Sequence, residues 1–140
     1  MADNKELVRR WYEDVWAKGD PGPLDALLAD DYVDHNPMPG LGDDKAAAAE
    51  TVKMIMSDAR DVDMRIGHMI AEGDFVAAHW KMDWTQQGAF MGMVPADGMR
   101  LSIEGHDFVR LAENQIAEVW HVEDMMSVMG QLGLIPEPGQ

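Results

Sequence analysis

The sequence predicts a single α+β domain, residues 1–140, with helices in its first half and an antiparallel sheet in its second. Apolar residues of the first half recur at helical spacing, whereas those of the second half alternate with polar residues. The alternating segments are joined by short turns, and no helical segment lies between them. A doubly wound parallel sheet would interleave helices and strands, so we expect an antiparallel sheet.

Three helices are expected before the sheet. The first ends at Gly19, because glycine readily terminates a helix. Its buried side is formed by five residues at helical spacing: Leu7, Val8, Trp11, Val15 and Trp16. A short second helix contains the leucines of residues 24–28, and a third begins near Asp43 or Asp44.

Four strands then follow, at about residues 64–70, 75–85, 101–111 and 116–122. In the first of them, His68 is expected to share one face with its apolar neighbours, and so to be a core or interface residue. The last two strands form a hairpin around residues 113–115. A final short helix begins near Met125 and ends at Gly133.

Composition excludes several classes of function. The formal net charge of −15 disfavours binding to nucleic acid or to anionic membranes. The absence of cysteine excludes disulfides, thiol nucleophiles and zinc–thiolate or iron–sulfur sites. No close-spaced set of metal ligands occurs, so no metal is expected. The chain has no stretch that resembles a signal peptide or a transmembrane helix, which predicts a cytoplasmic location.

Several segments carry a resemblance to a known family through their order and spacing. They are VRRWYEDVW at 8–16, DYVDHNP at 31–37, IAEGDFVA at 70–77, GAFMG at 88–92, IAEVW at 116–120 and QLGLIP at 131–136. With these segments the chain resembles the SnoaL-like polyketide cyclases of the nuclear transport factor 2-like superfamily, over about residues 7–136. The resemblance implies a cone-like curved sheet around a deep pocket, dimers or higher oligomers, no cofactor, and intramolecular aldol condensation of polyketide esters.

Aldol closure needs a base that removes a carbon-bound proton and donors that stabilise the enolate oxygen. His121 follows Trp120, where the resemblance places the catalytic acid–base group, usually an aspartate. Asp107 stands where the resemblance places the partner histidine, so the two residue types are exchanged. A three-residue turn would set Asp107 opposite His121, whereas a two-residue turn would set His106 there. The alternative is a pair on the sheet face without a chemical role.

Asp124, three residues beyond His121, has two interpretations. It is either the N-cap of the final helix or a pocket carboxylate that orients or replaces His121. His35 and Asn36 likewise either shape a loop before Pro37 or contact a ligand at the pocket mouth. The family's Gly-Thr-His segment is missing after Trp84, which leaves the substrate undetermined.

Aromatic residues of the second half are candidate walls for an enclosed cavity. We expect Trp80, Trp84, Phe90 and Trp120 to contact a ring-shaped apolar ligand. Six methionines near this region are interpreted as core filling, with an adaptable pocket lining as the alternative: Met82, Met91, Met93, Met125, Met126 and Met129.

The leading hypothesis is therefore a cofactor-independent enzyme, a cyclase or a related lyase or isomerase, in which His121 is the principal acid–base residue. An epoxide-hydrolase-like enzyme would need an arginine between two carboxylates, and a non-catalytic binding module would need only the pocket. The strand that carries Phe75, Ala77, His79 and Lys81 has a face of mixed character. We expect this face to form a homodimer interface.

Overall fold

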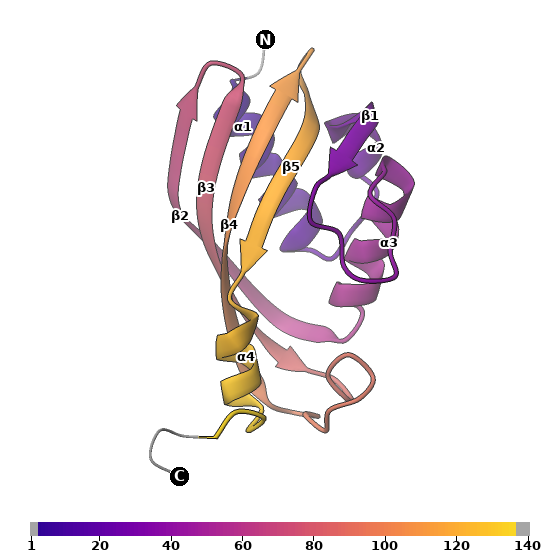
Figure 1. Ribbon diagram of the computed structural model, residues 1–140, viewed down its shortest axis with the longest axis vertical. Helices are drawn as coiled ribbons and strands as arrows, with labels where there is room; N and C mark the ends of the chain where they lie inside the picture. Colours follow the sequence, from indigo (N-terminus) through magenta and orange to yellow (C-terminus); the bar gives the residue numbers. More distant parts are fainter. Residues whose placement is uncertain (1–2, 137–140) are drawn as a thin grey trace.

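The computed structural model describes residues 3–136 and has an open five-stranded sheet with helices packed on one face (Figure 1). The strand order is β1-β5-β4-β3-β2. The helices are α1 (Asn4–Arg10), the π-helical segment η1 (Trp11–Trp16), α2 (Leu24–Leu27), α3 (Lys45–Met56) and α4 (Met125–Gln131). The strands are β1 (Leu28–Asp34), β2 (Ala59–Glu72), β3 (Phe75–Gln86), β4 (Arg100–Ala112) and β5 (Gln115–Glu123). The α+β class is confirmed.

Helix α1 and η1 form one continuous rod that lies along the inner face of the sheet (Figure 1). The side chain of Asp3 accepts a hydrogen bond from the backbone N–H of Lys5 and so caps the first turn. Leu7, Val8 and Val15 are buried against the sheet, as their helical spacing predicted. The i→i+5 hydrogen bonding of η1 is unusual, because π-helical turns are rare and frequently occur at functional sites.

The expectation of a wholly antiparallel sheet is wrong at one edge. Leu28 does not end the second helix but begins β1, which pairs in parallel with β5. Leu28 and Tyr32 are buried, so this strand contributes to the core. The leucines of residues 24–28 also fit a helix, and parallel pairing with a strand some 90 residues later has no local signal.

Strand β2 also departs from the expected alternation. Its pairing with β3 shifts register between Ile66 and His68, which marks a β-bulge at Gly67. Met64 and Ile66 face inward and pack against the core, whereas Ile70 is 68% exposed on the other side. The extra residue, Gly67, reverses the alternation. Met64 and Ile66 therefore lie on one face of the sheet, and His68 and Ile70 lie on the other. His68 is exposed and is not a core residue.

The core lies between the sheet and the N-terminal helices. Its largest fully buried side chains come from α1, η1, α3, α4 and every strand except β2: Val8, Tyr12, Val15, Leu28, Val52, Val76, Leu101, Val109, Ile116, Val119 and Val128. Of the six methionines interpreted as core filling, Met82 is buried and the other five are exposed. None of the helices within residues 3–136 is long and apolar enough to cross a membrane.

Gly105 on β4 has no room for a side chain. An ideal Cβ at this position would lie 2.5 Å from Cζ2 and 2.8 Å from Cε2 of Trp80. Gly105→Ala should therefore lower the free energy of unfolding by about 1–3 kcal/mol, the usual cost of overpacking. Gly130→Ala is the matched control, because Gly130 is helical and its Cβ would meet no atom within 4 Å. The control should gain stability by about 0.5–1 kcal/mol in urea denaturation. A Gly105→Ala protein as stable as the wild type would contradict this account.

Candidate active site

The β4–β5 hairpin brings Asp107 and His121 opposite each other on the inner face. Its turn has two central residues, Glu113 and Asn114, both with positive φ (51° and 63°). A regular two-residue hairpin would pair His106 with His121. A bulge between Arg110 and Leu111 shifts the register by one residue, and Asp107 becomes the partner.

Asp107 is a buried carboxyl group that accepts a hydrogen bond from a tyrosine. It is 7% exposed, and the Tyr12 hydroxyl on η1 donates to its Oδ2 at 2.6 Å. Burial raises the pKa of Asp107 to about 6, against the opposing effects of the Tyr12 hydrogen bond and the charge of His121. Burial and the adjacent Asp107 raise the pKa of Tyr12, so the phenol remains a proton donor. Asp107 thus changes protonation close to neutral pH.

His121 lies between two other carboxylates. Its Nε2 is 2.9 Å from Oδ1 of Asp34 at the end of β1, and its Nδ1 is bonded to Glu123 on its own strand. Burial alone would disfavour the charged ring, but Asp34 and Glu123 outweigh it and raise the pKa of His121 to about 10. Both ring nitrogens therefore carry protons at neutral pH.

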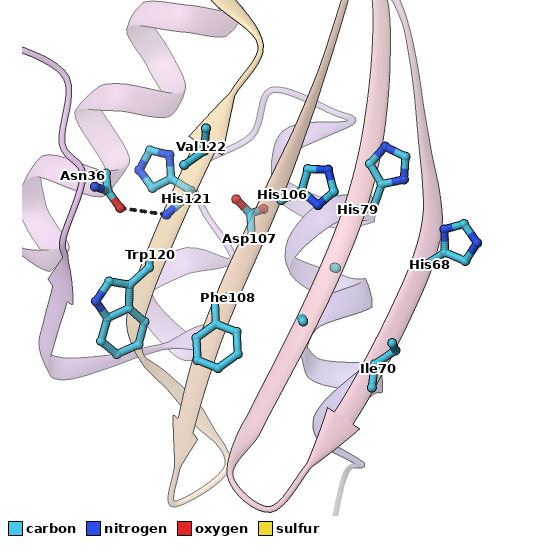
Figure 2. A pocket seen from close by; sticks show the side chains of 12 residues that line it. Asn36, His68, Ile70, His79, His106, Asp107, Phe108, Trp120, His121 and Val122 are labelled. Carbon is cyan, nitrogen blue, oxygen red and sulfur yellow. Dashed lines mark hydrogen bonds between the residues drawn. The ribbon is translucent and has the colours of Figure 1, made fainter.

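The backbone of His121 is fixed from the β1 side as well. Its N–H donates to Oδ1 of Asn36 at 2.8 Å, across 85 positions of sequence (Figure 2). The N–H of Asn36 in turn donates to Oδ1 of Asp34. The segment after β1 thus holds both the ring and the backbone of His121.

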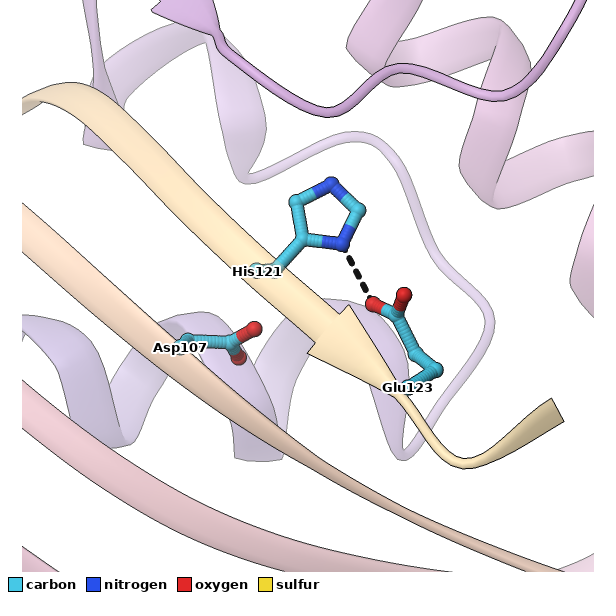
Figure 3. A group of neighbouring side chains, drawn as sticks. All are labelled: Asp107, His121 and Glu123. Atoms are coloured by element: carbon cyan, nitrogen blue, oxygen red, sulfur yellow. Dashed lines mark hydrogen bonds and ion pairs between the residues drawn. The ribbon is translucent and has the colours of Figure 1, made fainter. Parts of the chain in front are cut away.

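Asp107, His121 and Glu123 form one cluster at the end of the hairpin (Figure 3). One ligand-type atom from each lies within 4.8 Å of the others, so this group is also where a cation could bind. The imidazolium already supplies a positive charge to the carboxylates. The arrangement pairs a carboxyl group that titrates near neutral pH with a fixed imidazolium, and this combination suits proton transfer.

Two candidates lie outside this cluster. His106 pairs with Val122 and stacks on His79 at a centroid distance of 4.7 Å, on the face of the sheet away from the helices. Asp124 caps α4, because its Oδ1 accepts the N–H of Ser127 at 3.1 Å. The N-cap interpretation of Asp124 is therefore confirmed.

Trp120 lines the hollow described below, but neither Trp80 nor Trp84 does, so the expectation that Trp80 or Trp84 shares one cavity with Trp120 is not met. Trp80 and Trp84 are inward-facing core residues of β3, whereas Trp120 is on the outer face of β5 and stacks on His35 at 4.4 Å. Phe90 lies in the loop after β3 and packs against the core edge. Successive side chains of a strand point to opposite faces of the sheet, so Trp120 lies on the other face from residues 119 and 121.

A hollow of about 460 Å³ is on the outer face (Figure 2). Twelve residues line it. Asn36, Ala78, Asp107 and His121 lie at its edge, and the others are outward-facing apolar and histidine side chains from four strands: His68, Ile70, Ala77, His79, His106, Phe108, Trp120 and Val122. No methionine lines it. Asp107 and His121 are among the residues that line this depression, so the charged cluster reaches it through the sheet.

Comparisons with known proteins agree with the fold described above. A model of the SnoaL-like polyketide cyclase family matches residues 6–132. The chain belongs to this family. No curated protein matches it significantly by sequence.

Solved structures extend the match to the whole SnoaL-like fold. TsrD from Streptomyces laurentii superposes with a TM-score of 0.81 at 24% identity, over 96% of this chain and 100% of TsrD. IdmH from Streptomyces antibioticus superposes with a TM-score of 0.81 at 24% identity, over 94% of this chain and 99% of IdmH. A SnoaL-like polyketide cyclase from Agrobacterium tumefaciens superposes with a TM-score of 0.76 at 20% identity, over 95% of this chain and 100% of that protein. At these identities the likeness establishes the fold.

Three residues of this cluster were missed in the sequence: Tyr12, Asp34 and Glu123. Tyr12 lies at helical spacing from Val8 and Val15, and a buried phenol needs a partner, which was a usable signal. Glu123 is two residues after His121 and so shares its face. Asp34 lies within the DYVDHNP segment of the resemblance, but its approach to His121 depends on the parallel strand, which the sequence did not predict.

The pKa of His121 predicts how stability depends on pH. Because folding raises this pKa from 6.5 to about 10, the stabilisation is fully present below pH 6.5 and is lost as the pH rises through 10. We expect the unfolding free energy of the wild type to fall over this interval relative to His121→Gln, which lacks the ionisation. Urea denaturation from pH 6 to 10 measures the difference. Parallel curves for the two proteins would show that the ring is not held as an imidazolium.

Proposed function

We propose that the protein is a cofactor-independent acid–base enzyme that acts on a small, apolar carbonyl compound. An intramolecular aldol cyclisation, or a related lyase or isomerase reaction, fits the family. The observation that carries the proposal is a buried carboxyl group with a pKa of about 6 beside a protonated histidine. A base poised near neutral pH is what proton abstraction next to a carbonyl requires.

In this proposal Asp107 is the base and His121 is the acid. The ionised Asp107 removes a proton from the carbon next to the carbonyl, and the Tyr12 hydroxyl holds the carboxylate in place. The resulting enolate attacks a second carbonyl and forms the new carbon–carbon bond, and the new alkoxide takes a proton from the imidazolium of His121, which Asp34 and Glu123 keep protonated before this step. The proton that Asp107 accepted then passes to His121, which restores both groups. These roles differ from the sequence prediction, in which His121 is the principal acid–base residue.

An epoxide-hydrolase-like reaction has less support. Three of the four strand arginines are bound elsewhere: Arg65 pairs with Asp83 at 3.1 Å, Arg110 pairs with Glu118 at 3.2 Å, and Arg100 donates to the carbonyl of Asp61. The fourth, Arg60, is exposed near the start of β2. Of the described residues, no guanidinium forms an ion pair with Asp107 or Glu123. A carboxylate–arginine–carboxylate arrangement therefore has no basis here.

The roles can be tested with 2-tetralone, whose α-hydrogen exchange in D2O is followed by proton NMR. Asp107→Asn removes the base and should slow the enzyme-dependent exchange by about a hundred- to ten-thousand-fold. The wild-type rate should rise with pH through about 6, as Asp107 loses its proton. Asp124→Asn is the control, because asparagine also caps a helix and the Asp124 carboxylate is bound to the N-terminus of α4.

Wild-type exchange no faster than in buffer would contradict the proposed chemistry. Exchange by Asp107→Asn at the wild-type rate would refute the base assignment, provided that thermal melts show the variant to be folded. Loss of activity in Asp124→Asn would instead point to the Asp124 carboxylate.

A homodimer through the outer face of the sheet is part of the same proposal. Val122 and Phe108 are 71% and 46% exposed beside the hollow, and the ring of Phe108 stacks on Phe75 with centroids 5.0 Å apart. An aromatic and aliphatic surface of this kind favours burial against a second copy.

Light scattering tests this assembly. The wild type at micromolar concentration should have twice the chain mass, and Val122→Glu should shift it to the monomer because a charge would be buried in the interface. Met93→Glu is the control, since Met93 is 79% exposed on a distant loop. A monomeric wild type would exclude the dimer.

A further inference from the structure

The indole N–H of Trp80 has no hydrogen-bond partner. Among the buried side-chain nitrogen and oxygen atoms of residues 3–136, the Trp80 Nε1 atom is the one that forms no hydrogen bond. Trp80 is 9% exposed, and an unmet buried donor costs about 1–3 kcal/mol. Trp84, two residues further on the same face, has the usual arrangement: its N–H donates to Oε1 of Gln86 at 3.0 Å. The fold thus satisfies one indole, whereas its neighbour has only a weak interaction with the Asp107 carboxylate that falls short of a regular hydrogen bond.

The position of the Trp80 ring follows from sheet register and from one glycine. Trp80 pairs with Gly105, and Gly105 pairs with Glu123 on the next strand. The indole crosses the space above Gly105, where a Cβ would lie 2.8 Å from Cε2, the carbon bonded to Nε1. The N–H edge is therefore on the inner face, near Asp107. Trp80 is also one of the groups that lower the pKa of Asp107, although the two do not reach hydrogen-bond geometry.

The charges around this N–H restrict what it can bind. Asp34, Asp107 and Glu123 contribute three carboxylates against the single imidazolium of His121. An anionic ligand would be repelled by this cluster and by the net charge of −15. A neutral oxygen acceptor, such as a ketone or ester carbonyl, satisfies the N–H without adding charge.

We propose that the Trp80 N–H donates to the carbonyl oxygen of the substrate, next to the carbon from which Asp107 takes the proton. This inference rests on the proposed acid–base function and narrows its substrate to neutral ketones and esters. A donor at this oxygen stabilises the enolate as negative charge develops there. Catalytic donors are frequently loose in the free enzyme and gain their geometry only in the complex.

The indole resonances of the wild type test the contact directly. In a ¹H–¹⁵N spectrum, saturating 2-tetralone should move the Trp80 indole N–H downfield, the direction expected for a new hydrogen bond. Tetralin has the same rings without the oxygen, so it should cause no downfield shift of the Trp80 indole N–H. The Trp84 N–H serves as the internal control, because it is already bonded to Gln86.

Trp80→Phe removes the donor and keeps an aromatic ring. It should weaken 2-tetralone binding by about two- to tenfold, the range for a neutral hydrogen bond, and leave tetralin binding unchanged. Trp84→Phe should bind both compounds as the wild type does.

The inference is overturned if 2-tetralone perturbs Asp107 and His121 but leaves the Trp80 N–H unmoved, or if Trp80→Phe binds it as tightly as the wild type. In those cases the acid–base proposal still stands, because it depends on the exchange reaction and on Asp107. Absence of any 2-tetralone binding overturns the Trp80 contact as well.

Discussion

The hydrogen bond from Tyr12 to the buried Asp107 is the constraint on which the site depends. A carboxyl group under a helix is costly unless it is hydrogen-bonded, and the phenol meets that need while burial shifts the pKa towards neutrality. The same bond ties η1 to the middle of β4. Helix placement, sheet register and the tuning of the acid are therefore parts of a single arrangement.

Small irregularities of the backbone determine which side chains meet. The bulge in the β4–β5 hairpin selects Asp107 over His106 as the residue opposite His121. The bulge at Gly67 turns His68 and Ile70 towards the outer face. In a sheet, one inserted residue moves every later side chain to the opposite face, so each bulge redistributes function between two surfaces.

The two faces of the sheet carry different kinds of chemistry. The inner face holds a compact set of ionisable groups in which His121 is fixed by Asp34, Glu123 and Asn36. The outer face holds a wide, mostly apolar depression with His35 stacked on Trp120. Strand alternation separates them by the thickness of one sheet, which lets acid–base groups and an apolar surface coexist in a small domain.

The sequence by itself determined the elements whose signals are local. The helical spacing from Leu7 to Trp16, the alternation in the later strands and the cap at Asp124 were all readable, because each depends on neighbours within a few residues. It also led to Asp107 and His121. Only the tertiary structure decided their partners. Asp34 arrives on a parallel strand, Tyr12 arrives from η1, and the hairpin bulge sets their register. Contacts of this kind join residues some 90 positions apart, and no short stretch of sequence encodes such a contact.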